Sequence, residues 1–188
     1  MEAVLIFAVL FFVVPGFYVL VQYNGLVSLR NHISDAWANI DTELKRRHDL
    51  IPNLVSTVKG YAKHEKEVLE RVVELRKQCI NAESFSNERT GAESQLDSAL
   101  AQLLMVVESY PDLKADRNFL ELQHELANTE NRIQAARRFY NGNVRDYRNK
   151  CQSFPSNVVA GIFGFESRDY FRADDDERDV VEIGFPDR

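Results

Sequence analysis

Residues 3–21 form an unbroken run of 19 residues without a charged side chain, AVLIFAVLFFVVPGFYVLV. A helix needs about 20 apolar residues to cross the hydrocarbon core of a bilayer. A core helix of a soluble domain would show one polar face, and this run shows none. Pro15 and Gly16 lie inside the run, where membrane helices tolerate them better than water-exposed helices do. The sequence therefore predicts that residues 1–23 are a transmembrane anchor.

The alternative to a retained anchor is a cleaved signal peptide, which needs a basic segment before the apolar run and a small-x-small cleavage site after it. Position 2 is Glu2, and the run ends in Val-Gln-Tyr-Asn at residues 21–24. We therefore expect the anchor to be retained as a single span. Arg30 and the basic residues 45–47 follow the span, and no Lys or Arg precedes it. The positive-inside rule then places the N-terminus outside and the domain in the cytoplasm.

The remainder of the 188-residue chain, about 165 residues, is enough for one compact domain. The net charge of −6 is uneven, because residues 172–188 hold seven acidic and three basic side chains, leaving about −2 for the rest. A nearly neutral body argues against a nucleic-acid binder. The acidic tail, 172–188, is predicted to be disordered. Cys79 and Cys151 are too few for a disulfide scaffold and lack metal-ligand spacing.

Apolar residues recur with a helical period after the anchor, which predicts an all-α domain at residues 24–153. Basic residues at 45–47, then Asp49 and Pro52, are typical of one helix ending and another beginning. The apolar period nevertheless continues across Pro52, so a kinked continuous helix is the alternative. Such a helix of ~60 residues would be ~90 Å long, and much of its apolar stripe would lack a partner. We therefore favour an antiparallel up-and-down four-helix bundle with long helices over three long helices, the first kinked at Pro52.

Turn-forming residues set the remaining boundaries. The second helix is expected to run to about Ala82, and residues 84–87 separate it from the third. Thr90 and Glu93 fit a capping box that would start the third helix. This helix is expected to end at 110–112, and the last long helix is expected to begin between Asp112 and Asn118 and to stop at 153–156.

Several blocks of sequence are distinctive, and they include AWANID (36–41), LKRRHDLIPNLV (44–55), VKGYAKHE (58–65), YPDLK (110–114), TENRI (129–133), ARRFYN (136–141) and FPSN (154–157). In this order, over about residues 1–171, they resemble the LemA family of bacterial membrane proteins. The resemblance implies a membrane helix, a helical bundle and a place in the bacterial inner membrane. It implies no reaction, since the family has no established enzymatic activity. One branch is associated with membrane-bounded organelles in bacteria.

No constellation of residues typical of an enzyme is present, and we expect neither a catalytic site nor a cofactor. Glu121 and His124 form one Glu-x-x-His pair, whereas a carboxylate-bridged di-iron bundle needs two such pairs. Neither cysteine lies in a nucleophile context, and the sequence has no glycine-rich phosphate loop.

Two charged residues of the last long helix, Glu130 and Arg137, fall at inward positions between apolar residues that recur every seven. A charge at such a position needs a partner, which Asp41, Asp49 or Glu65 on neighbouring helices could supply. We favour register-fixing pairs for this candidate polar core. The functional alternative is a polar groove that binds a metal or a small ligand.

Residues 154–171 are rich in aromatic and apolar side chains but too short to span a membrane. The helix before them ends in a basic stretch. If that helix returns to the bilayer, both parts reach its surface together, as interfacial binding requires. The candidate membrane-surface residues are Arg138, Arg145, Arg148, Lys150, Ile162, Phe163 and Phe165. The alternative is that this aromatic C-terminal segment folds back and covers the end of the bundle.

These features predict a non-enzymatic, membrane-tethered helical scaffold or adaptor that organises a membrane patch or holds a partner protein. The alternative is a metal- or small-ligand-binding bundle that uses the polar core. The expected partners are the lipid bilayer and an unidentified membrane or cytoplasmic protein, without nucleic acid.

Overall fold

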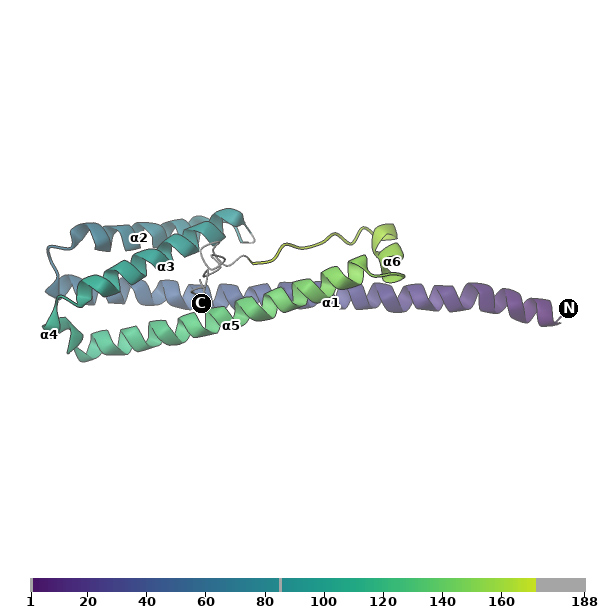
Figure 1. The fold of residues 1–188 in the computed structure, drawn as a ribbon, viewed down its shortest axis with the longest axis horizontal. Coiled ribbons are helices and arrows are strands. Elements are labelled where there is room, and N and C mark those ends of the chain that lie inside the picture. The colour runs from purple at the N-terminus through teal and green to yellow at the C-terminus, as the bar shows by residue number, and fades with distance from the viewer. Residues whose placement is uncertain (1, 85, 172–188) are drawn as a thin grey trace, which may run out of the picture. The chain divides into compact units, whose positions relative to one another are not determined.

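The computed structural model describes residues 2–84 and 86–171, with the side chains of 3–10 and 87 left out. All regular secondary structure in this part of the chain is helical, which confirms the all-α prediction. The helices are α1 (Glu2–Tyr61), α2 (Lys66–Asn81), α3 (Asn87–Val107), α4 (Pro111–Lys114), α5 (Arg117–Gln152) and α6 (Ser156–Ile162) (Figure 1). The acidic tail at 172–188, predicted to be disordered, lies outside the described residues.

Helix α1 is 60 residues long and runs without interruption through Pro52, so the predicted helix break there is wrong. Pro52 is exposed, whereas Ile51, Leu54 and Val58 around it are fully buried. The apolar stripe therefore holds the helix together across a residue that lacks one backbone donor. The chain turns instead at residues 62–65, between α1 and α2. The rest of α1 with α2, α3 and α5 still gives four helical stretches after the anchor, which fits the predicted number.

The helices pack as two compact units, and both α1 and α5 contribute to each. Unit 1 comprises Met1–Glu43 and Arg132–Tyr170. Within the described residues, unit 2 comprises Leu44–Asn131 and Phe171.

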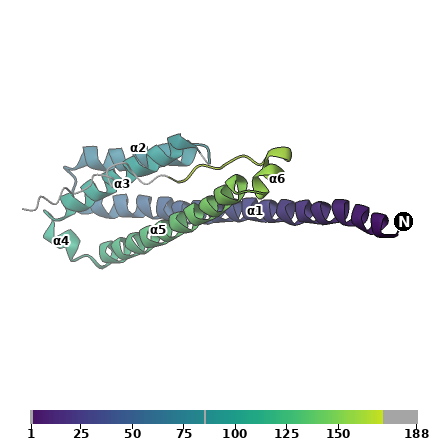
Figure 2. The same cartoon turned by 45° about the vertical axis from the view of Figure 1, so that its right-hand side comes forward.

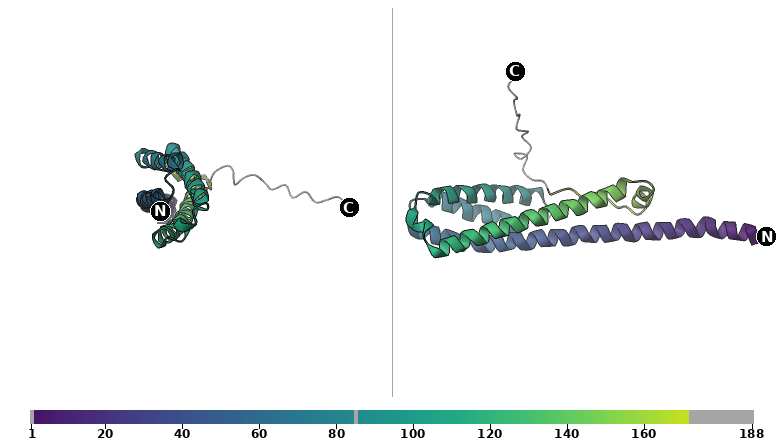
Figure 3. Two further views of the ribbon diagram at one scale, coloured as in Figure 1. Left: turned by 90° about the vertical axis from the view of Figure 1, so that its left-hand side faces the viewer. Right: turned by 60° about the horizontal axis from the view of Figure 1, so that its bottom comes forward.

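In unit 2, α2 and α3 lie side by side, as the teal ribbons in Figures 1, 2 and 3 show. Ser86 caps the first turn of α3, because its Oγ accepts a hydrogen bond from the Arg89 amide at 3.0 Å. The predicted capping box is therefore wrong, since α3 begins at Asn87 and Thr90 already lies within it. The core of this unit is built from residues Ile51, Leu54, Val58, Leu69, Val72, Leu75, Cys79, Leu96, Leu103, Leu113 and Phe119.

Unit 1 has a smaller apolar core, where the buried Trp37 of α1 meets the buried Tyr140 of α5. Their rings pack edge to face with centroids 5.5 Å apart, a favoured aromatic geometry. Trp37 is therefore a core residue of this unit.

Helix α6 is tied to the end of α5 and closed by a glycine. Ser156 Oγ lies 2.6 Å from the carbonyl oxygen of Lys150, a hydrogen-bond distance, and holds the first turn of α6. Gly164 has a φ of 67°, in the left-handed region that favours glycine. The amide of Phe165 then donates to the carbonyl of Ala160 at 2.9 Å, as in a Schellman helix end. This turn fixes the position of Phe165 relative to α6.

Helix α1 is the one described helix that is long and apolar enough to cross a membrane. Only 6% of the most apolar 18-residue stretch of α1 is buried within the protein. Phe11, Phe12 and Phe17 are 72, 73 and 68% exposed. Soluble domains rarely leave an apolar surface of this extent in contact with water. The N-terminal part of α1 therefore fits the predicted membrane anchor.

Candidate functional site

A buried arginine forms the centre of unit 2. Arg47 of α1 is 2% exposed, although arginine is almost never buried unless it is paired. Its Nη2 donates to the Glu93 carboxylate, and its Nη1 donates to Asp97 and to Glu130, the latter at 3.0 Å. Glu93 and Asp97 belong to α3 and Glu130 to α5. One side chain of α1 therefore connects two later helices within this unit.

The position of Arg47 in α1 explains its burial. Arg47 follows Leu44 by three residues and precedes Ile51 by four, and the side chains of Leu44 and Ile51 are both buried. Residues at such spacings share one helix face. Lys45 and Arg46 point outward and are exposed. The three basic residues predict a helix end, whereas in the structure the helix continues and Arg47 belongs to its buried stripe.

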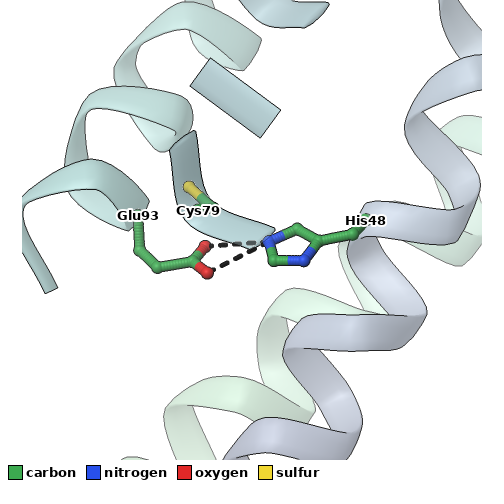
Figure 4. A group of neighbouring side chains, drawn as sticks. All are labelled: His48, Cys79 and Glu93. Carbon is green, nitrogen blue, oxygen red and sulfur yellow. Dashed lines mark hydrogen bonds and ion pairs between the residues drawn. The ribbon is translucent and has the colours of Figure 1, made fainter. Parts of the chain in front are cut away.

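Glu93 is completely buried and contacts His48 as well as Arg47. His48 Nε2 lies 3.0 Å from Glu93 Oε1 and 3.3 Å from Oε2, as Figure 4 shows. His48 is itself buried, and its backbone carbonyl accepts a hydrogen bond of 2.6 Å from Arg76 Nε of α2. The polar cluster thus includes a contact from α2.

Cys79 of α2 lies against this cluster and is also fully buried. The ligating atoms of His48, Cys79 and Glu93 all lie within 4.8 Å of one another (Figure 4). Burial, with a further contribution from the Glu93 charge, raises the pKa of Cys79 to about 12. The thiol is therefore protonated at neutral pH, whereas a nucleophilic cysteine must be a thiolate.

The charges of the cluster hold one another in the ionised form. Burial alone would raise the pKa of Glu93, but the hydrogen bond from His48 and the charge of Arg47 lower it below its usual value. Burial alone would lower the pKa of Arg47, but Asp97, Glu93 and Glu130 raise it. Buried, paired charges of this kind are suited to fixing the register of helices, since any other register would leave a charge unpaired.

Three of the predicted polar-core residues, Glu130, Glu65 and Asp49, belong to unit 2. Glu130 is half-buried but pairs with Arg47. Glu65 is half-buried and accepts a hydrogen bond of 3.0 Å from the Tyr110 hydroxyl, while Asp49 is exposed. Sequence reasoning did not select the buried residues Arg47, His48 and Glu93. Their helical spacing from buried leucines was the available signal.

Asp41 and Arg137, the other two predicted polar-core residues, both belong to unit 1 and are half-buried on α1 and α5. The pairing of Asp41 with Arg137 stays a prediction.

The aromatic C-terminal segment lies beside the end of the apolar run in unit 1. The rings of Phe163 and Phe165 pack edge to face on Tyr23, with centroids 4.9 and 5.5 Å from it. Tyr23 follows the uncharged run by two residues. A Cβ at residue 25 would meet Lys150 Nζ and Cε, so the Lys150 side chain lies directly against α1 at Gly25. Two separate contacts therefore place the ends of α5 and α6 at the membrane-proximal part of α1.

The two faces of α6 differ. Val159 and Ala160 are buried within unit 1. Val158, Ile162 and Phe163 are 52, 71 and 50% exposed and form an outward apolar face.

The predicted basic residues are spread along α5. Arg138 and Arg145 are exposed, Lys150 is half-buried, and the half-buried Arg148 lies 5.1 Å over the ring of Tyr170. Arg138 precedes Lys150 by about 18 Å along the helix, at 1.5 Å per residue. Of these four basic residues, Arg145, Arg148 and Lys150 are therefore the closest in sequence to the apolar face of α6.

Comparison with known proteins gives one family and several relatives. A model of the LemA family matches residues 36–185. Protein LemA of Metamycoplasma hominis is 29% identical, over 92% of this chain and 80% of that protein. Magnetosome protein MamQ 2 of Paramagnetospirillum magneticum is 24% identical and Magnetosome protein MamQ of Magnetospirillum gryphiswaldense 23% identical, each over 81% of this chain and 65% of the relative. The family match extends into the acidic tail, which was expected to lie outside the family's blocks.

Proposed function

Because this chain belongs to the LemA family, we propose that it is a membrane-tethered helical scaffold of the bacterial inner membrane, without catalytic activity. The names of its relatives state no enzymatic activity. Its long apolar helix, together with these relatives, identifies it as a membrane-associated protein. The basic residues after the span favour a cytoplasmic domain. In this proposal, the protein organises the bilayer around it or holds another protein there.

The observation that carries the proposal is the exposed apolar face of α6 beside the end of the span. Phe163 contacts Tyr23 and yet leaves half of its surface exposed, and Ile162 is 71% exposed. Tyr and Trp side chains are enriched where a membrane helix leaves the hydrocarbon core. An apolar face at the level of Tyr23 thus lies where the interface of the bilayer covers it. We infer that the bilayer is the surface on which α6 rests.

The charge near this face fits an anionic membrane surface. Arg145, Arg148 and Lys150 are basic, and Asp146 is the only acid between them. Each such charge contributes about 1 kcal/mol near an anionic bilayer, and this attraction weakens when salt screens it. The α6 contact therefore combines apolar burial with attraction to anionic headgroups.

The continuity of α1 supports a scaffold role. Beyond residue 23 the helix continues to Tyr61, which corresponds to about 57 Å at 1.5 Å per residue. A helical connection is stiffer than a flexible linker. The names of the MamQ relatives place them with magnetosomes, and we extend a role in organising a membrane to this chain.

The experiment measures whether position 163 inserts into lipid. The full chain, carrying Trp37→Phe and Phe163→Trp, is reconstituted into anionic liposomes that contain brominated lipids, which quench tryptophan on contact. We expect strong quenching at position 163. The matched control is Phe139→Trp, since Phe139 is 60% exposed in the same unit but lies within α5, and its tryptophan is expected to keep its emission. Equal emission from both positions with and without bromine would contradict the α6 contact.

A further inference from the structure

Three buried side chains of unit 2 converge on one point, where their chemistry matches that of a metal site. His48 Nε2, Cys79 Sγ and the Glu93 carboxylate come from α1, α2 and α3, and these atoms lie within 4.8 Å of one another. Imidazole nitrogen, thiolate sulfur and carboxylate oxygen are the ligand types that zinc takes in proteins. All three residues are buried, unlike the scattered acidic groups of a protein surface.

The distances between the ligand atoms suit a tetrahedral ion. Zinc binds nitrogen or oxygen at about 2.0–2.2 Å and sulfur at about 2.3 Å, which places neighbouring ligand atoms roughly 3.3–3.6 Å apart. His48 Nε2 and the two oxygens of Glu93 are 3.0 and 3.3 Å apart. An ion between them therefore requires a small separation of His48 and Glu93, which face one another in Figure 4, and Cys79 Sγ, within 4.8 Å of both, completes the site by moving toward them.

The charge balance around the cluster also favours a cation. Arg47 and Arg76 contribute two positive charges against the three carboxylates of Glu93, Asp97 and Glu130, which leaves an excess of one negative charge when His48 is neutral. A divalent ion bound to the Cys79 thiolate adds one net positive charge and balances this excess. Arg47 occupies Glu93 Oε2, so Oε1 is the oxygen that faces the ion, and a hydrogen bond to the second oxygen orients a ligating carboxylate.

We propose that His48, Cys79 and Glu93 bind one zinc-class divalent ion that ties α1, α2 and α3 together. Magnesium and calcium prefer oxygen ligands, so the thiol and imidazole select for zinc over them. On binding, the Cys79 S–H bond breaks, the sulfur–metal bond forms and one proton is released to solvent. Affinity therefore rises with pH.

The test uses the full chain, purified in detergent without a histidine tag and titrated with Co²⁺ as a coloured substitute for Zn²⁺. We expect one Co²⁺ per chain, a near-ultraviolet thiolate-to-cobalt absorption band, and loss of the band when Zn²⁺ displaces the cobalt. Cys79→Ser should abolish the band and weaken binding at least tenfold. Cys151→Ser is the matched control, because Cys151 belongs to the other unit, and it should keep both properties.

Two results would overturn the proposal: a wild-type protein that binds Co²⁺ without the thiolate band, or Cys79→Ser that binds as tightly as wild type. Circular dichroism checks that each variant is folded. Cadmium NMR of the unsubstituted protein gives a readout that needs no variant, since a sulfur ligand shifts the cadmium signal far downfield of an oxygen and nitrogen site. A signal without that shift would also contradict the site. These measurements are made in micelles, so they are independent of the contact between α6 and lipid.

Discussion

Removing the charge of Arg47 tests the energetic role of the buried cluster in unit 2. Arg47→Leu keeps an apolar stem on the core stripe but leaves Glu93, which is 0% exposed, as a buried charge beside His48 and the Cys79 thiol. Removing one partner of a buried pair costs about 3–5 kcal/mol. Asp97 and Glu130 are 36 and 39% exposed and regain solvent, so they add little to this cost.

The expected loss corresponds to a decrease in melting temperature of about 6–20 °C, at 2–4 °C per kcal/mol for a chain of this size. The measurement is thermal unfolding of the full chain in mild detergent, followed by circular dichroism. Lys45→Leu is the control on the same helix, because Lys45 is exposed, and it should change the melting temperature by less than about 2 °C.

A double variant separates a buried charge from a simple loss of packing. Arg47→Leu with Glu93→Gln removes both charges and keeps a hydrogen-bonding group for His48. We expect it to be more stable than Arg47→Leu alone by more than about 1 kcal/mol, because the unpaired buried charge is gone. The reasoning is refuted if the double variant is as unstable as the sum of its single variants, or if Arg47→Leu melts with the wild type.

Three further predictions follow from other parts of the structure. Pro52→Ala should raise the stability by about 1–3 kcal/mol, because proline is about 3 kcal/mol worse than alanine inside a helix; an unchanged urea midpoint would argue for a helix end at this residue. The pKa of Glu93 is lowered from its usual value of about 4.5. This shift contributes stability that is complete above the usual pKa and is lost as the pH falls through the lower folded value. Glu93→Gln should therefore show a weaker loss of stability below about pH 4.5 in acid titrations followed by circular dichroism. Trp37 should emit at short wavelength and resist iodide quenching, and Tyr140→Ala should shift its emission to the red by opening the cavity beside it; a spectrum that does not respond would contradict the Trp37–Tyr140 contact.

Sequence periodicity was sufficient for the helical class and for several boundaries. The second helix was expected to end near Ala82 and α2 ends at Asn81, and α5 begins at Arg117 within the expected range. These boundaries follow from local signals, such as turn-forming residues at 84–87 and a proline after residue 110. Such signals need no knowledge of the partner helices.

Two errors arose where a local signal and a tertiary contact competed. Pro52 is a local signal for a helix start, but the buried residues on either side of it continue the helix. Glu93 has the spacing of a capping carboxylate after Thr90, but its side chain is needed in the core by Arg47 and His48. Only the neighbouring helices decide which role such a residue takes, and a single sequence does not contain them.

The candidate functional residues also fall into two groups, those that the sequence indicates by itself and those that only the fold brings together. The sequence pointed to Phe163 and Phe165 because aromatic content is visible without a fold, and the structure brings both against Tyr23. It did not point to the convergence of His48 and Cys79, since these residues are far apart in the chain. That juxtaposition depends on the turn at residues 62–65, which the sequence placed elsewhere.

The central claim is that one continuous helix crosses the bilayer and continues into the domain. It is tested by spin labels placed singly along residues 11–61 of the chain, with Cys79 and Cys151 replaced by serine, in liposomes. We predict access to oxygen but not to a water-soluble nickel reagent up to residue 21, access to nickel at exposed positions from residue 24, and an unbroken period of 3.6 residues through Pro52. Nickel access within the apolar run, or a loss of the helical period around Pro52, would contradict the account.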